Sequence, residues 1–429
     1  MCHLLLFLSN TAKFDKIVGM MRTYEYRLYP RRAEVKALNR LLEQHSEVYN
    51  RALEQCKNGY EARGKGQSAL SQWPYFRDWR NSFEDLILNA SSLQHTLRKL
   101  DKAFSAFFRR VKVGETPGYP RFKGKDRLKS VEYSYGDGCR LEYDEAFDRF
   151  VLHVQNVGAI KVKLHRLLPD FAKIKHVVLK HKASGWYVYL MIDMPDPLPA
   201  QPNGCPMVGA DMGLLRLLSL SDGTLIDNPH WLREGLAELR RAQRRLSRAG
   251  RSSNRRKDKR LLVAKLHEYI ANIRRDFYHK LTFWLAHTYS LIALENLNLD
   301  FMLRNAHLSL SAHDAGLGMF RMMLTYKAVD AGSHITFVDP AYTSQACSGC
   351  GELVAKSLNV RVHSCPSCHL ELDREVNAAI NILKLASAPP AGRESARIEP
   401  SVDNVAARRW GPKRQSMRLG SDPIGPGQA

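Results

Sequence analysis

Four cysteines near the end of the chain constrain its fold more than any other feature of the sequence. Two C-x2-C pairs, separated by fourteen residues, are formed by Cys347, Cys350, Cys365 and Cys368. Each pair can present two thiolates from one turn, and two turns complete a closed tetrahedral zinc site. We therefore expect one structural Zn²⁺. The alternative, four reduced thiols without a metal, is disfavoured because this spacing is among the more specific sequence signals.

The balance of charge indicates a polyanionic partner. The 429-residue chain has 65 Lys and Arg against 43 Asp and Glu, a formal net charge of +22. Such an excess is typical of proteins that bind nucleic acid. A membrane surface is the rival polyanionic partner. The sequence has no apolar run of about 18 residues, so we expect no membrane partner. The remaining cysteines are scattered, which suits a reducing cytoplasm.

The apolar pattern predicts strands at both ends of the first half of the chain and helices between them. Alternation over 22–30 predicts a strand, and three- and four-residue apolar spacing over 32–111 predicts helices. Gly and Pro over 114–127 indicate a loop, after which β-rich stretches return. The Pro-rich stretch 195–206 predicts a linker between two domains.

The second half alternates strands and helices, as in an α/β core. Residues 207–227 predict an apolar strand, a turn at 221–223 and one further strand. The other elements expected are long helices from about 232 to 289, a buried strand in 290–299, a helix over 317–332, a strand over 334–340 and a last helix from 373.

Three carboxylates stand where a charged residue needs a partner or a structural reason. Asp211 and Glu295 each interrupt an apolar run, and Asp373 opens an apolar helix. Taken singly, each could be structural, and Asp373 could simply cap its helix. Taken together, two carboxylates on neighbouring core strands and a third on a helix can converge and hold two Mg²⁺ ions for in-line attack on a phosphodiester. A basic protein with such a set is a candidate nuclease.

The order of these motifs resembles the RuvC-like nuclease of TnpB proteins, the OrfB-type proteins of bacterial insertion sequences related to compact type V CRISPR effectors. Asp211 lies in "GADMG", Glu295 in "ALENL" and Asp373 in "DREVNAAINI", with the cysteines between the last two. The resemblance extends from about Met20 to Leu385 and includes "YEYRLYP", "GYPRFKGK", "SAHDAGLGMF" and "TSQACSGCG". In that family the zinc ribbon is inserted just before the final catalytic helix, which accounts for a metal knuckle that abuts Asp373.

The resemblance implies a fold and an activity. The fold is α/β plus a β-barrel and a helical lobe: a RuvC-like (RNase H fold) nuclease with an inserted zinc ribbon, and an N-terminal wedge barrel with an inserted helical recognition domain. The activity is RNA-guided, Mg²⁺-dependent cleavage of double-stranded target DNA, with a guide RNA from the transposon end, in the bacterial cytoplasm. The boundaries expected are a disordered leader at 1–19, the wedge-like barrel at 20–31 and 112–200, the recognition lobe at 32–111, the nuclease at 205–342 and 370–388, the ribbon at 343–369 and a disordered tail at 389–429.

Basic stretches supply candidate contacts to nucleic acid. Residues 233–260 hold twelve Lys or Arg against three Asp or Glu, and aromatic residues are interleaved with basic ones at 118–125. Such a run is often only a solvated helix face, and that interpretation stays open. In a nuclease the same face could follow a nucleic-acid backbone. His363 and His369 are expected to be solvated or to face nucleic acid. The proposed basic contacts are Arg121, Lys123, Arg240, Arg241, Arg244, Arg245, Arg255 and Arg256.

Two other functions are compatible with the same sequence. A guided repressor or an accessory transposition factor would bind nucleic acid without essential cleavage. A transposase would use similar metal-binding carboxylates for strand transfer. The nucleic acid that co-purifies with the protein, and whether Mg²⁺ then permits cutting, would distinguish these functions.

Overall fold

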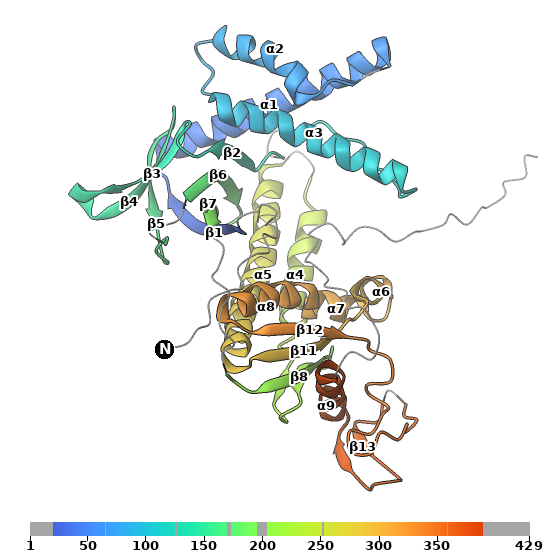
Figure 1. Cartoon of the computed structure of the whole chain (residues 1–429). Helices are drawn as coiled ribbons and strands as arrows, with labels where there is room; N and C mark the ends of the chain where they lie inside the picture. Colours follow the sequence, from blue (N-terminus) through green and yellow to red (C-terminus); the bar gives the residue numbers. More distant parts are fainter. Residues whose placement is uncertain are drawn as a thin grey trace, which may run out of the picture. The chain divides into compact units, whose positions relative to one another are not determined.

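The computed structural model describes residues 20–64, 66–124, 127–169, 173–194, 204–250, 253–357 and 359–388. These residues fall into two compact units, an N-terminal unit at 21–193 and a C-terminal unit at 194–388 (Figure 1). The expected leader and tail, and most of the expected linker, lie outside the described residues. Within the described part of the chain, no helix is long and apolar enough to cross a membrane.

The N-terminal unit is built on a curled sheet of seven strands in the order β2-β6-β7-β1-β5-β4-β3 (Figure 1). Every pair with a described register is antiparallel. The sequence pattern does not predict β2 and β3, because both are short and carry charged residues. The strands are β1 (Met20–Tyr29), β2 (Ser130–Ser134), β3 (Cys139–Asp144), β4 (Arg149–Val154), β5 (Gly158–Lys163), β6 (Lys173–Lys182) and β7 (Gly185–Met194).

Three helices lie between β1 and β2, in the region expected to be helical. Their apolar faces bury leucines such as Leu38 and Leu97, and both α1 and α3 contact β2. Asn89 caps α3, because its side chain accepts a hydrogen bond from the Ser91 N–H at 2.7 Å. The start of α3 is therefore fixed beside the β2 edge of the sheet. The helices are α1 (Arg32–Arg63), α2 (Ala69–Asn81) and α3 (Ala90–Lys112).

The C-terminal unit contains a five-stranded mixed sheet in the order β10-β9-β8-β11-β12. β8, β11 and β12 are parallel, whereas β9 is antiparallel to β8 and β10 is antiparallel to β9. This matches the alternation of strands and helices expected from the sequence. The strands are β8 (Met207–Met212), β9 (Arg216–Leu220), β10 (Leu225–Asp227), β11 (Leu291–Glu295) and β12 (His334–Val338).

The prediction of a single strand before the turn at 221–223 is wrong, because the chain forms two strands there, β8 and β9. The chain reverses at Gly213, whose N–H donates to the Leu217 carbonyl at 3.3 Å. A Cβ at Gly213 would lie 2.6 Å from the Arg216 carbonyl oxygen, so a larger residue would not fit this reversal. The reversal sets Ser219 of β9 opposite Asp211 of β8.

Helices cover both faces of this sheet (Figure 1). One face packs against α5 and α8 in a cluster that includes Tyr278 and Phe320. The other face carries α9, whose Ile382 packs with Ala293 and Val338. The helices are α4 (Trp231–Ser247), α5 (Asn254–Thr288), α6 (Leu299–Arg304), α7 (Ser309–Ala315), α8 (Leu317–Ala331) and α9 (Arg374–Ser387).

Gly209 allows β8 and α9 to approach each other closely. A Cβ at this position would lie 2.0 Å from the Ala379 carbonyl oxygen and 2.7 Å from the Leu383 nitrogen. The backbones of the strand and the helix are therefore nearly in contact. This packing fixes the position of α9 relative to the end of β8.

Replacing Gly209 with Ala should destabilise the C-terminal unit, because the added methyl group cannot fit unless α9 moves away from β8. We expect a loss of roughly 1–3 kcal/mol in the free energy of unfolding, measured by urea denaturation. The control is Gly250→Ala, since a Cβ at Gly250 meets no atom within 4 Å. Equal midpoints for the two variants would contradict this close packing.

Candidate active site and cysteine cluster

Asp211 and Glu295 lie side by side on two adjacent parallel strands. β8 pairs with β11 in a register that sets Ala210 beside Leu294, so the next residue of each strand is one of these acids. Glu295 is only 7% exposed, and its Oε1 accepts a hydrogen bond from the Thr343 hydroxyl at 2.5 Å. Both acids therefore lie on neighbouring core strands, as expected.

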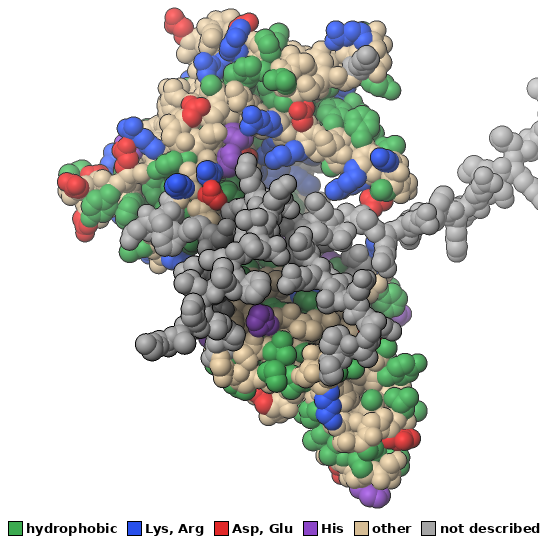
Figure 2. Space-filling model, in the orientation of Figure 1, with side chains coloured by type: hydrophobic (Ala, Val, Ile, Leu, Met, Phe, Trp, Pro, Cys, Tyr) green, Lys and Arg blue, Asp and Glu red, His purple; other side chains and the backbone are tan. Residues whose placement is uncertain are grey.

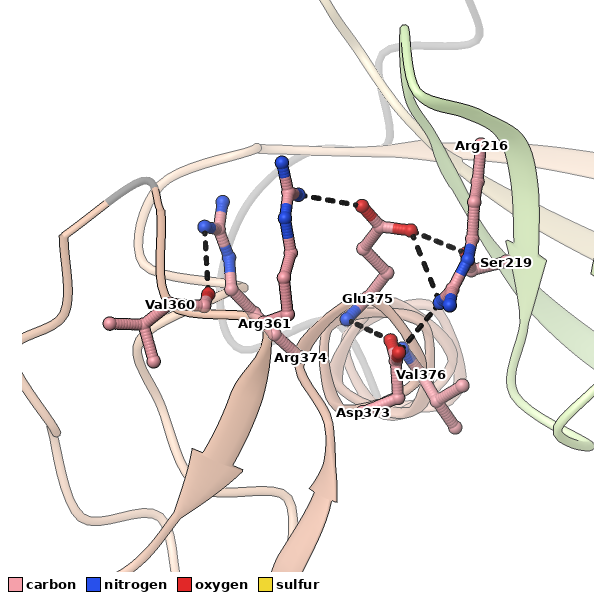
Figure 3. A network of polar contacts seen from close by, with 8 residues as sticks. All are labelled: Arg216, Ser219, Val360, Arg361, Asp373, Arg374, Glu375 and Val376. Atoms are coloured by element: carbon pink, nitrogen blue, oxygen red, sulfur yellow. Dashed lines mark hydrogen bonds and ion pairs between the residues drawn. The ribbon is translucent and has the colours of Figure 1, made fainter. Parts of the chain in front are cut away.

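Asp373 immediately precedes α9 and caps it. Its Oδ1 accepts hydrogen bonds from the backbone N–H groups of Glu375 and Val376, at 2.9 and 3.4 Å. Its Oδ2 accepts a hydrogen bond from Arg216 Nη1 at 2.6 Å (Figure 3). Both carboxylate oxygens are thus bonded within the chain, and the capping role that the sequence left open is present.

These acids lie close enough to raise the cost of ionising one another. Desolvation and the negative charges of neighbouring acids together raise the pKa of Asp211 to about 7, although the positive charge of Arg374 opposes the shift. The acids that contribute are Glu295, Glu375 and Asp373. Burial also raises the pKa of Glu295. Burial alone would raise the pKa of Asp373, but the Arg216 guanidinium and the helix amides outweigh it and lower that pKa. A cation at this point would relieve the repulsion around Asp211.

Glu375 is a further acid near Asp211 that the sequence pattern does not single out. We call Asp211, Glu295, Asp373 and Glu375 the acidic group. The Oε2 atom of Glu375 accepts a hydrogen bond from the Ser219 hydroxyl at 3.1 Å and lies 3.7 Å from Arg216 Nη1 (Figure 3). Its Oε1 accepts a hydrogen bond from Arg361 at 3.1 Å. Its charge acts on Asp211 more strongly than the charge of the capping aspartate does. Its place in the first turn of α9 is the signal that could have identified it.

The predicted metal-binding carboxylates do not form a compact ligand cluster in this structure. In the described part of the chain, two groups of His, Cys, Asp or Glu have ligand atoms all within 4.8 Å of one another, and neither contains Asp211, Glu295 or Asp373. Instead, the Arg216 guanidinium stands against Asp373 and Glu375. The structure therefore places the three acids within electrostatic range, with one of them bound to an arginine.

The four predicted zinc ligands meet in one cluster. Their Sγ atoms all lie within 4.8 Å of one another. Two of the distances are 3.5 Å, between Cys347 and Cys368 and between Cys350 and Cys365. Four thiolates at about 2.3 Å from a zinc ion would stand roughly 3.8 Å apart. The cluster therefore fits a closed zinc ribbon.

His363 lies on β13 (Val362–Ser364), which pairs with β14 (Glu371–Asp373). The expectation that it is solvated or faces nucleic acid is wrong, because its side chain is fully buried. The alternation of the strand turns it inward, where its Nδ1 contacts Lys356 Nζ. His369 is exposed, as expected.

Two asparagines on α9 hold the ribbon beside the acids. Asn377 accepts a hydrogen bond from the Ser348 N–H and donates one to the Ala346 carbonyl, both at 2.8 Å. Asn381, one turn later, donates to the carbonyls of Thr343 and Ala346 at 2.9 and 2.7 Å. The same threonine donates to the buried glutamate of β11. One hydrogen-bonded network therefore joins the ribbon to the acidic group.

The basic residues predicted as contacts on α4 and α5 differ in their surroundings. Arg256 donates to the carbonyls of Leu246 and Ala249, at 3.0 and 2.8 Å, and so satisfies the end of α4. Because its guanidinium is already hydrogen-bonded within the protein, Arg256 is a weaker candidate for binding a phosphate. On these two helices, the predicted contacts that are exposed are Arg240, Arg241, Arg244, Arg245 and Arg255.

Arg121 and Lys123 lie in a loop of the N-terminal unit that is held against α1. The Asn50 side chain accepts a hydrogen bond from the Lys123 N–H at 2.7 Å and donates one to its carbonyl at 2.9 Å. Lys123 Nζ lies 4.6 Å from the centroid of the Tyr49 ring, and Arg121 is exposed. Figure 2 shows Lys and Arg side chains spread over the helices of this unit. Contact of these residues with nucleic acid stays a prediction.

Three protein families match successive parts of the chain. The family described as "Probable transposase" (OrfB_IS605) matches residues 187–306. The "Helix-turn-helix domain" (HTH_OrfB_IS605) matches 20–65, a stretch that here forms β1 and α1. The "Cas12f1-like, TNB domain" matches 318–382, which includes the cysteine cluster and most of α9.

Individual relatives match over most of their length. A Streptomyces pristinaespiralis protein named "Putative RNA-guided DNA endonuclease" is 31% identical over 92% of this chain and 96% of its own. An Escherichia coli (strain K12) protein, "Putative RNA-guided DNA endonuclease InsQ", is 29% identical over 78% of this chain and 85% of its own. The solved structure described as "Cryo-EM structure of the Cas12f1-sgRNA-target DNA complex" has a similar fold, with a TM-score of 0.51 at 18% identity over 82% of each chain. The chain therefore belongs to the TnpB/OrfB family, to which the compact type V CRISPR effectors are related.

Proposed function

We propose that this chain is an RNA-guided DNA endonuclease that cuts target DNA by metal-dependent hydrolysis of a phosphodiester. The observation that carries the proposal is the pair of acids, Asp211 and Glu295, on adjacent strands, where desolvation and neighbouring carboxylates raise the pKa of Asp211, in a protein of net charge +22. Acids that oppose one another's ionisation in this way favour a bound cation. Membership of the family and the names of the two relatives support the same activity.

We assign the parts of this activity to the two units. The five-stranded sheet with α9 would form a RuvC-like (RNase H fold) nuclease, and the curled sheet a wedge barrel. The guide RNA and the target DNA would be bound by the basic surfaces, through phosphate contacts that neutralise the polyanion. The proposed divisions are the wedge barrel at 20–31 and 112–200, the recognition lobe at 32–111, the nuclease at 205–342 and 370–388, and a ribbon with one structural Zn²⁺ at 343–369.

The donor set of the acidic group suits Mg²⁺, which prefers hard carboxylate oxygens. Asp211, Glu295 and Asp373 would hold two Mg²⁺ ions, with Glu375 as a further acid at the same place. When bound, Mg²⁺ would supply activation of the attacking water and stabilisation of the leaving oxygen. Asp211 would be the central ligand of this set, because it feels the charges of Glu295, Glu375 and Asp373. Arg216 can exchange Asp373 for a substrate phosphate, because a guanidinium pairs with either group.

A second function is favoured by one specific observation, the ion pair between Arg216 and Asp373 at 2.6 Å. A guanidinium that stayed at this position during DNA binding would block a metal ligand. The chain would then be a guided repressor or an accessory transposition factor that binds DNA without essential cleavage. Cutting of a guided target by the wild type separates the two functions.

Replacing Asp211 with Ala should lower cleavage of a guided plasmid in Mg²⁺ by at least about 100-fold, and leave target binding in Ca²⁺ largely unchanged. Binding depends on base pairing and basic surfaces, whereas this carboxylate serves the chemistry. The control is Glu371→Gln, which changes an exposed acid of β14 and should cut normally.

Each outcome of this assay decides between the assignments. Cutting by Asp211→Ala at the wild-type rate would remove the nuclease assignment for this site. Loss of both binding and cutting would indicate a structural role for Asp211. A wild-type chain that binds its guided target but does not cut it would favour the second function.

Replacing Asp211 with Asn should stabilise the fold at pH 8. The folded protein raises the pKa of Asp211 from 3.8 to about 7, so it holds this proton more tightly than the unfolded chain does. The stability that the proton confers is full below the unfolded pKa and is lost as the pH rises through about 7. One pKa unit corresponds to about 1.4 kcal/mol, so we expect a gain on the order of a few kcal/mol at pH 8. Urea unfolding should show this gain shrink toward pH 5.

Asp222→Asn provides a control of opposite sign. Burial alone would raise the pKa of Asp222, but hydrogen bonds from the Tyr289 hydroxyl at 2.5 Å and the Thr224 N–H at 2.9 Å lower it. Its ionised form therefore stabilises the fold at pH 8, and this substitution should lower the unfolding free energy there. Mg²⁺ added at pH 8 should stabilise the wild type but not Asp211→Asn. Destabilisation by both substitutions would be evidence against the electrostatics of the acidic group.

A further inference from the structure

His95, Glu132 and His176 converge in the N-terminal unit. Among the described residues, two groups have metal-binding atoms that all lie within 4.8 Å of one another. One is the cysteine cluster, and these three residues are the other. Glu132 Oε1 is 3.3 Å from His95 Nδ1 and 3.8 Å from His176 Nδ1. The three residues share no sequence motif, because they lie far apart in the chain.

The three residues come from three different elements of the fold, α3, β2 and β6, which Figure 1 labels. α3 carries His95 and packs against β2, the edge strand of the curled sheet. β2 pairs with β6 so that Ser134 lies opposite His176. Glu132 is two residues before Ser134 and therefore points to the same face of the sheet. A register shift between β6 and β7 just before His176 adds a local kink to that strand.

The distances in this group suit a shared ion better than direct hydrogen bonds. A charge-assisted hydrogen bond from a nitrogen to a carboxylate is about 2.7–2.9 Å long. Ligand atoms at about 2.0–2.1 Å from a tetrahedral Zn²⁺ stand roughly 3.3–3.4 Å apart. The separations of 3.3 and 3.8 Å are closer to the second arrangement. His176 Nδ1 is also buried without a hydrogen-bond partner, and a metal ion would satisfy it.

The ring of His95 is held in the orientation that a metal ligand needs. Its Nε2 lies 3.2 Å from Ser134 Oγ, which leaves Nδ1 on the side of Glu132. In protein metal sites the second ring nitrogen almost always makes such a contact, which fixes the ring. The rings of His95 and His176 also meet edge to face, with 5.3 Å between their centroids.

The group is open to solvent on one side. The side chains of Glu132 and His176 are 35% and 37% exposed, whereas that of His95 is 8% exposed. An ion could therefore enter from solvent and keep a water molecule as a fourth ligand. Arg98 and Lys102, on the same helix as His95, place positive charge within range of its ring. These charges should make binding weaker than at four thiolates, with Glu132 as the opposing charge.

We propose that His95, Glu132 and His176 bind one divalent transition-metal ion of the Zn²⁺ type. Imidazole nitrogens and a carboxylate oxygen are donors that suit this ion, and three of them with one water complete a tetrahedron. The ion ties α3 to β2 and β6 and so fastens the helices onto the sheet. The site does not rest on the proposed nuclease function.

The test is the zinc content of the whole chain after equilibrium dialysis against micromolar Zn²⁺. The wild type should hold about two zinc ions, one at the cysteine cluster and one at this site. Glu132→Gln and His176→Ala should each hold one ion fewer, and so should Cys365→Ser, which changes only the other site. Added Zn²⁺ should raise the unfolding midpoint of the wild type more than that of Glu132→Gln or His176→Ala, which keep only the cysteine site.

The matched control is His153→Ala. His153 Nε2 and Glu142 Oε2 lie 2.9 Å apart with similar exposure, 40% and 41%. Glu142 also pairs with Arg140, and among the described residues no third metal-binding side chain joins the pair. This variant should keep both zinc ions. Only one zinc in the wild type overturns the proposal, as does a second zinc that remains in either Glu132→Gln or His176→Ala. Because the two half-exposed positions are changed independently, misfolding of one variant leaves the other to decide.

Discussion

The packing of α9 against β8 is the interaction on which the rest of the C-terminal unit depends. Gly209 has no side chain, and any side chain at this position would force the strand and the helix apart. The helix then brings its capping acid and its first-turn glutamate within electrostatic range of Asp211. The same helix uses Asn377 and Asn381 to bind the loop that leads into the cysteines. One helix thus orders the acids and the cysteine cluster together, and this cluster lies directly before Asp373 in the sequence for this reason.

Charge is unbalanced where the parallel strands end. Arg216 pairs with Asp373 and Glu375, but Asp211 is partly buried beside several carboxylates, whose effect on its pKa the nearby Arg374 opposes. Ionising Asp211 therefore costs stability, and carboxylates perturbed in this way gather at functional sites. A divalent cation would supply the missing positive charge, and a DNA phosphate could then draw Arg216 away from the carboxylates. This electrostatic argument, more than the likeness of fold, favours a nuclease over a passive DNA-binding protein.

Local patterns predicted β8, β11 and α9, and with them the positions of the three expected acids, because apolar spacing is a property of the nearby sequence. The cluster of four cysteines was predictable because the C-x2-C spacing is likewise a local property of the sequence. The reversal at Gly213 depends instead on a backbone contact that no spacing encodes. The burial of His363 and the bonds of Glu375 depend on tertiary packing. The group around Glu132 joins three elements that only the folded chain brings together.

The claim that the acids at the ends of β8 and β11 hold a divalent cation is tested most directly by counting bound Mn²⁺. Mn²⁺ accepts the oxygen ligands that Mg²⁺ prefers, and electron paramagnetic resonance measures the fraction that stays free in solution. In zinc-saturated protein, the wild type should immobilise Mn²⁺, and Glu295→Gln should lose this binding. Unchanged Mn²⁺ binding by the Glu295→Gln chain would contradict the account.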